Sequence, residues 1–125
     1  MRFAFCVALI FSYSFSHAQV CSDPVNTIYG LTNGGFIHAI DVPTGTVSPA
    51  INPAYPGNAP DQSNGLGYNA LNGKFYYFNR IPSSTIIEFV SFDPATNMYE
   101  LLSSPATTSS VYSGSITNDG DGYYM

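Results

Sequence analysis

The pattern of apolar and polar positions after residue 18 is that of short strands. No stretch keeps apolar residues at helical spacing over three turns, and Pro or Gly interrupts the chain about every ten residues. This spacing predicts an all-β domain. The predicted strands are Thr27–Leu31, Gly35–Asp41, Gly45–Pro49, Gly65–Tyr68, Lys74–Asn79, Ile86–Asp93, Met98–Leu102, Tyr112–Thr117 and Gly122–Met125.

One predicted strand, Ile86–Asp93, carries large apolar side chains on both faces. Alternation along a strand places Ile87 and Phe89 on one face and Val90 and Phe92 on the other. A sheet with one face in water alternates apolar with polar residues instead. The pattern therefore predicts a sheet that packs between two other layers.

Turn residues separate the strands. Asn33-Gly34-Gly35 and Asn72-Gly73 supply the positive φ angles of tight hairpin turns, and Asp41–Gly45 and Asp93–Asn97 predict a second kind of turn, closed by the Asp side chain. Longer connections are predicted for the Pro-rich segment 48–64 and the Ser/Thr run 103–110.

The chain repeats part of itself. Residues 37–45 return as 89–97, and 65–75 return as 114–124, an alignment that matches Phe75 with Tyr124. A period near 50 residues made of short strands is typical of the blades of a β-propeller. We therefore predict units at about 27–64 and 65–113, and a truncated unit at 114–125.

The segments Gly65–Asn69, Asn72–Tyr77 and Phe92–Thr96 resemble the blades of secreted bacterial β-propeller domains of unknown function. The resemblance implies an extracellular propeller, and it transfers no catalytic residues. A propeller has about four to eight four-stranded blades, whereas this chain holds about two units, so we expect an incomplete propeller. The last strand would then leave an open sheet edge, through which we expect association.

The first 18 residues have the pattern of a signal peptide. Arg2 precedes an apolar stretch, Phe3–Phe15, and Ser16-His17-Ala18 has the small residues that signal peptidase reads. The stretch is too short to span a bilayer, which takes about 20 residues. We expect cleavage after Ala18, a secreted or cell-surface protein, and no membrane span after cleavage.

Charge and cysteine content narrow the function classes. After residue 18, Lys74 and Arg80 are the only strong bases against eight acids, so nucleic-acid binding is excluded for want of a basic patch. Cys21 stands alone once Cys6 leaves with the signal peptide. Either its disulfide partner is missing from this sequence, or Cys21 is a free thiol without a structural role. The sequence favours neither interpretation.

Two groups of residues are candidates for binding. Asn118, Asp119 and Asp121 resemble part of a calcium loop, but their match to the non-acidic Ala70–Gly73 favours a hairpin turn, and we expect no metal. Flat rings stack on sugars, but the pattern favours the other role of these rings, which is to fill space between sheets. These aromatic candidates are Tyr76, Tyr77, Tyr123 and Tyr124.

No catalytic constellation stands out. Glu88 and Glu100 are the only glutamates, and a carboxylate pair is what a glycosidase uses, but one carboxylate on each of two adjacent strands is the simpler interpretation. We expect no enzyme activity and no cofactor. The function predicted is an exported recognition or scaffold module for an unknown protein or glycan. The alternatives are a fragment of a propeller enzyme acting on extracellular glycans, or a purely structural spacer.

Overall fold

The computed structural model describes residue 23 and the segments 25–56, 60–81, 86–107, 113–117, 119–120 and 122–124. Within these segments the protein is all-β, without a helix, as the sequence predicts. Residues 1–18, which are predicted to be a signal peptide, lie outside the described residues, as do Cys21, Asn118 and Asp121.

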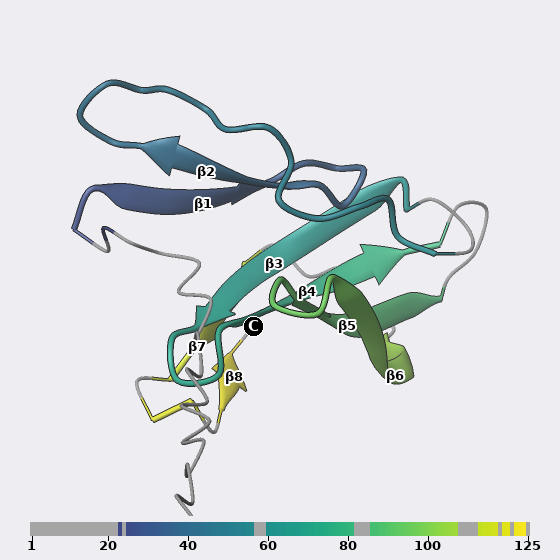
Figure 1. Ribbon diagram of the computed structural model, residues 1–125. Coiled ribbons are helices and arrows are strands. Elements are labelled where there is room, and N and C mark those ends of the chain that lie inside the picture. The colour runs from purple at the N-terminus through teal and green to yellow at the C-terminus, as the bar shows by residue number, and fades with distance from the viewer. Residues whose placement is uncertain are drawn as a thin grey trace, which may run out of the picture.

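Eight strands form three antiparallel sheets in the described part of the chain (Figure 1). The middle sheet has four strands in the order β3-β4-β5-β6, and a two-stranded sheet precedes it and another follows it. The strands are β1 (Thr27–Leu31), β2 (Ile37–Asp41), β3 (Gln62–Asn69), β4 (Lys74–Arg80), β5 (Ile87–Asp93), β6 (Met98–Thr107), β7 (Ser115–Ile116) and β8 (Tyr123–Tyr124).

Strand bounds differ from prediction mainly at the outer strands. The segment Gly45–Pro49 forms only an isolated bridge, between Val47 and Ile40, and no full strand. Strand β6 runs on to Thr107, so the predicted connection 103–110 was wrong over its first half. The outermost strand of a sheet tolerates Pro105, because a missing N–H is no loss on an edge that faces solvent.

The turns follow their sequence signals. Gly35 and Gly73 both adopt positive φ, 80° and 72°. Asp41 accepts a hydrogen bond from the backbone N–H of Thr44 at 2.9 Å, and Asp93 accepts one from Ala95 at 2.9 Å. Each Asp side chain thus accepts a backbone N–H within its turn, and this hydrogen bond stabilises the turn.

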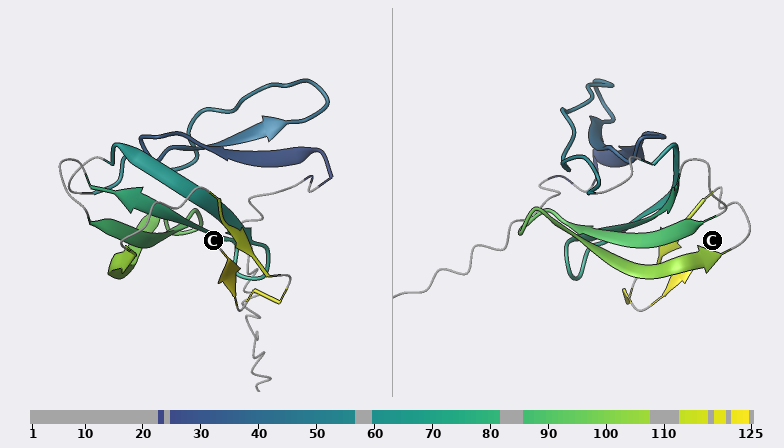
Figure 2. Two further views of the ribbon diagram at one scale, coloured as in Figure 1. Left: turned by 180° about the vertical axis from the view of Figure 1, so that it is seen from behind. Right: turned by 90° about the vertical axis from the view of Figure 1, so that its right-hand side faces the viewer.

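The four-stranded sheet lies between the two smaller ones, as Figure 2 shows from two sides. On one face, Phe75 of β4 packs edge-on against Tyr29 of β1, with ring centres 4.8 Å apart. On the opposite face, Phe78 of the same strand packs against Tyr123 of β8 at 5.5 Å. A layer therefore lies on each face of the middle sheet, and apolar side chains on both sides of its strands fit this arrangement.

The main core fills the space between the first hairpin and the middle sheet. Its fully buried members each contribute about 1.5–3 kcal/mol by leaving water. They are Ile37, Phe75, Tyr77, Val90 and Phe92, with Tyr29, Leu31 and Ile51 packed around them.

A buried amide ties the Pro-rich connection to this core. Asn52, only 4% exposed, accepts a hydrogen bond from the Ile37 N–H at 2.6 Å and donates one to the Gly35 carbonyl at 2.7 Å. Its amide also donates to the hydroxyl of Tyr99, which in turn donates to the Pro53 carbonyl at 2.9 Å. The connection is thus an ordered part of the interlayer contact over these residues.

The last hairpin pairs in the same register, counted from its turn, as the hairpin of β3 and β4. In the first hairpin of the middle sheet, Tyr68 and Phe75 form the second pair from the turn, and in the last hairpin Ile116 and Tyr123 do so. Tyr123, and not Tyr124, therefore corresponds to Phe75.

Candidate functional site

The adjacent tyrosines of β4 point to opposite faces of the middle sheet. Tyr77 is fully buried in the core, where its hydroxyl donates to the Gly35 carbonyl at 3.3 Å and lies 3.3 Å from the Tyr99 hydroxyl. Burial is the main cause that raises the pKa of Tyr77, and the Tyr99 hydroxyl adds to it. This side chain fills space between layers and offers no surface to a ligand.

The last hairpin covers part of the other face. The ring of Tyr123 lies 4.9 Å from Phe89 and 5.5 Å from Phe78, and its hydroxyl donates to the Gly65 carbonyl. Burial raises the pKa of Tyr123 to about 12. Tyr124 pairs with Ser115 in β8, and its side chain lies outside the described atoms.

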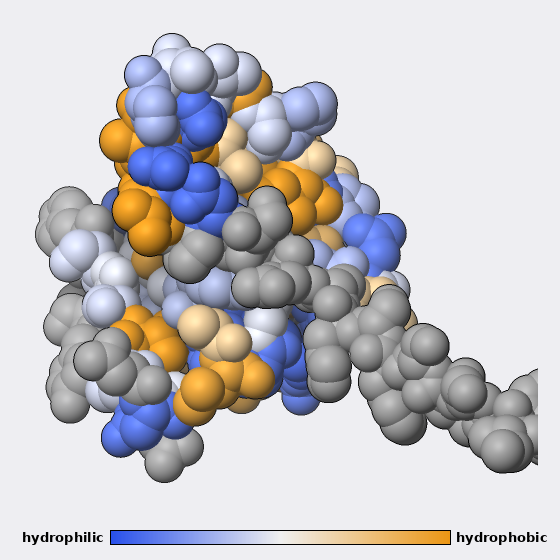
Figure 3. Space-filling view, turned by 60° about the vertical axis from the view of Figure 1, so that its left-hand side comes forward, coloured by the Kyte–Doolittle hydropathy of each residue, from blue (hydrophilic) through white to orange (hydrophobic). Residues whose placement is uncertain are grey.

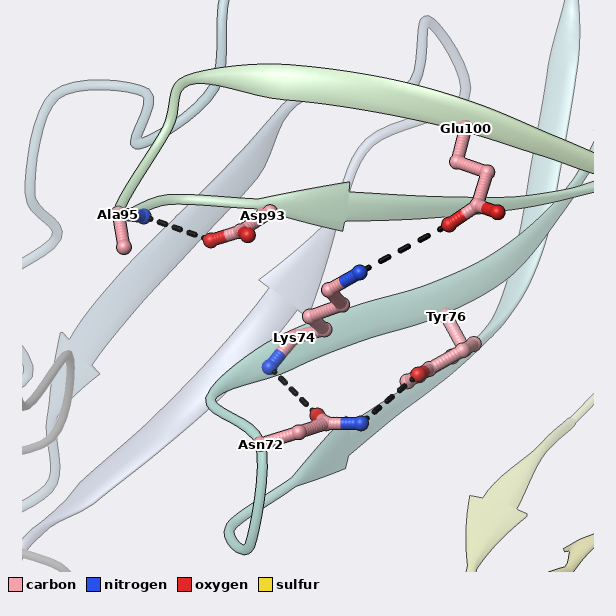
Figure 4. A network of polar contacts seen from close by, with 6 residues as sticks. All are labelled: Asn72, Lys74, Tyr76, Asp93, Ala95 and Glu100. Atoms are coloured by element: carbon pink, nitrogen blue, oxygen red, sulfur yellow. Dashed lines mark hydrogen bonds and ion pairs between the residues drawn. The ribbon is translucent and has the colours of Figure 1, made fainter.

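Tyr76, like Tyr123, is half-buried, and polar side chains lie beside it. It shares its face with Phe89, whose ring centre lies 6.2 Å away. The Asn72 amide donates to the Tyr76 hydroxyl at 3.0 Å and accepts from the Lys74 backbone N–H at 3.0 Å, as Figure 4 shows. The turn between β3 and β4 thereby fixes the orientation of the tyrosine ring.

An ion pair completes this polar surface. The Lys74 Nζ lies 3.7 Å from Glu100 Oε2, and the two side chains are 30% and 63% exposed. The ion pair reaches across β5, which lies between the strands of Lys74 and Glu100. In the sheet register, the buried Ser91 of β5 lies opposite Tyr76 on one side and Glu100 on the other. An ion pair this exposed contributes about 0–1 kcal/mol, so both groups remain available to a ligand at little cost to the fold.

We call these four residues, Asn72, Lys74, Tyr76 and Glu100, the Tyr76 surface. They come from two strands, β4 and β6, and one turn, and the sheet behind them is packed on the buried core. Sequence reasoning identified Tyr76 and Glu100 separately. It did not bring Lys74 and Glu100 together, because they lie on non-adjacent strands of the sheet and nothing in the local pattern predicts that contact.

The two glutamates do not form a pair. Glu88 lies opposite Asn79 on the side of the sheet that faces the first hairpin, where it accepts a hydrogen bond from the Tyr55 hydroxyl at 2.9 Å. Glu100 lies on the other side, opposite Ser91. Carboxylates on opposite faces of one sheet cannot flank a single glycosidic bond.

The candidate calcium loop is described only in part. Asp119 is exposed, and Gly120 adopts a φ of 76° in a turn closed by its N–H donating to the Thr117 carbonyl at 2.9 Å. The Asn69 amide binds the Gly120 carbonyl at 3.1 Å. Among the described residues, no three His, Cys, Asp or Glu side chains gather in a way that would hold a metal ion.

Comparison with family models, with curated proteins and with solved structures found no match to this chain. Over the ranges that the structure covers, no helix has the length and apolar character needed to cross a membrane.

Proposed function

We propose that this chain is an exported, non-catalytic recognition or scaffold module, built from a propeller-type stack of antiparallel sheets. The observation that carries the proposal is the way successive units pack. Phe75 of the middle unit faces the first hairpin, and Tyr123, at the corresponding position of the third unit, faces the middle sheet in the same manner. Units that stack repeatedly in one direction are the architecture of propellers and solenoids.

Surface composition supports a role in contact rather than in chemistry. The first hairpin exposes apolar side chains, and Figure 3 shows such residues among hydrophilic ones over the molecule. Ile28 and Val47, which flank Ile40 in the hairpin register, are 55% and 57% exposed. Exposed apolar side chains gathered on one hairpin suit contact with a further layer or a protein partner.

The Tyr76 surface supplies the recognition part of the proposal. An aromatic ring fixed by an amide, with a cation and an anion beside it, combines a stacking surface with hydrogen-bonding groups on a rigid sheet. A glycan or a polar protein segment has matching chemistry. The apolar and polar surfaces lie on different layers, and each can act without the other.

A glycan and protein array probed with the purified chain tests this function. We expect specific capture that Tyr76→Ala reduces about tenfold or more, a loss of about 1.4 kcal/mol. Leu71→Ala is the matched control, because Leu71 is 71% exposed in the turn between β3 and β4 and is not one of the four residues of the Tyr76 surface. Equal loss in both variants, or no capture at all, would overturn the recognition role, and turnover of polysaccharides would favour the enzyme alternative.

A further inference from the structure

Three Asn-Gly pairs lie in the described chain, at residues 33–34, 64–65 and 72–73. In any such pair, the backbone nitrogen of the glycine can attack the side-chain amide carbon of the asparagine, and the missing Cβ hinders the attack least. Asparagine is for this reason among the thermolabile residues of proteins. The structure places the three pairs in different surroundings, which predicts different reactivities.

In the pair Asn72–Gly73, both reacting groups, the Gly73 nitrogen and the Asn72 side-chain amide, are hydrogen-bonded. The Gly73 N–H donates to the Asn69 carbonyl at 2.8 Å. The Asn72 side chain is bound at both ends, by the Lys74 N–H and by the Tyr76 hydroxyl, each at 3.0 Å. Ring closure would have to break these hydrogen bonds, so this turn is protected.

The pair Asn64–Gly65 is held by the sheet. Asn64 pairs with Phe78 in the ladder between β3 and β4, and Gly65 is buried. The Gly65 N–H donates to the side-chain oxygen of Asn64 at 3.3 Å, and its carbonyl accepts from Tyr123. The Asn64 side chain is exposed, but Gly65 is buried in a β-bulge of this strand with a φ of 70°, so closing a ring here requires that held backbone to rotate.

The pair Asn33–Gly34 lies in the turn between β1 and β2, where neither constraint applies. Asn33 is exposed, and within the described part of the chain no hydrogen bond reaches its side chain or the Gly34 N–H. The turn is closed one residue later, by the Gly35 N–H donating to the Thr32 carbonyl at 3.0 Å. We propose that Asn33 is a site of spontaneous deamidation in this protein.

The reaction balances without a cofactor or an oxidant. Base removes the proton from the Gly34 nitrogen, which forms a bond to the Asn33 side-chain carbon, Cγ. The proton taken from Gly34 is returned to Nδ2 by the base or by water, the bond from Cγ to Nδ2 breaks, ammonia leaves, and a five-membered succinimide remains. Water then opens the ring at either carbonyl, which leaves an aspartate or an isoaspartate at position 33 and adds one negative charge.

The product affects the contact between layers. The Asn33 carbonyl accepts a hydrogen bond from the Ser63 N–H at 2.9 Å, and this bond joins the first hairpin to β3. Isoaspartate routes the backbone through the former side chain and so moves that carbonyl. Aspartate keeps the original backbone path and the bond.

Peptide mapping of the purified chain, aged in warm and mildly alkaline buffer, tests the proposal. Chymotrypsin separates the three pairs, because Phe36 and Tyr68 lie between them. We expect the mass gain of deamidation in the Asn33 peptide about tenfold faster than in the other two, since the protected sites must first give up hydrogen bonds. In concentrated urea the three rates should converge.

Two variants serve as controls. Gly34→Ala should slow the reaction at Asn33 alone, and it should fold, because the added Cβ meets nothing closer than 3.6 Å, at Phe36. Asn33→Asp carries the new charge without the altered backbone, so its stability should stay near that of the fresh protein while the aged protein loses stability. Fastest reaction at Asn64 or Asn72, or equal rates in the folded protein, would overturn the assignment.

Discussion

Replacing Asn52 by alanine tests whether the buried amide holds the first hairpin on the middle sheet. The substitution removes the acceptor of the Ile37 N–H, which is fully buried and has no access to water. The Gly35 carbonyl keeps a hydrogen bond from Tyr77, and the Tyr99 hydroxyl keeps its bond to Pro53. The loss of stability therefore comes mainly from the Ile37 N–H, which is left without an acceptor, and from the other hydrogen bonds of Asn52 that are lost.

A buried donor without a partner costs about 1–3 kcal/mol, and the lost bond to the Gly35 carbonyl adds about 1 kcal/mol. We expect Asn52→Ala to lower the free energy of unfolding by about 2–4 kcal/mol. Urea titration followed by circular dichroism measures this as a shift of the midpoint at unchanged slope. A changed slope would instead indicate a change in compactness.

Asn72→Ala is the matched control. Asn72 also binds a backbone N–H and a tyrosine hydroxyl, each at 3.0 Å, but it is exposed. Water replaces its partners, so we expect a loss of about 0.5 kcal/mol or less. If the two variants lose similar amounts of unfolding free energy, or if Asn52→Ala is as stable as the parent, burial does not strengthen the contribution of the Asn52 hydrogen bonds to stability.

Two further predictions concern the tyrosine hydroxyls and the last hairpin. Burial raises the pKa of Tyr55 to about 12, with Glu88 adding to the shift, so stability should hold up to the ordinary tyrosine pKa and fall as the pH rises through about 12. Alkaline unfolding curves check this, and a Tyr55→Phe variant with an unchanged alkaline loss would contradict it. Gly67→Ala should cost about 1–3 kcal/mol, because its Cβ would lie 2.9 Å from Ile116 of β7, and a variant as stable as the parent in urea would show that β7 does not pack there.

The sequence by itself determined where most strands lie and which positions are buried. Alternation placed Phe89 and Val90 on opposite faces, and the Asn-Gly and Asp turns marked the hairpins, because both signals depend only on neighbouring residues. The prediction of a sheet covered on both faces follows from the same pattern. One member of the Tyr76 surface, Tyr76 itself, was a candidate from its ring alone.

The tertiary structure decided which distant residues meet. It joined Asn52 to Tyr99 and Lys74 to Glu100, and it separated Glu88 from Glu100 by a sheet. Such contacts depend on strand register and on the packing of whole layers. A shift of one residue exchanges the faces of a strand, so the local pattern that places a strand in the chain does not say what its side chains will touch.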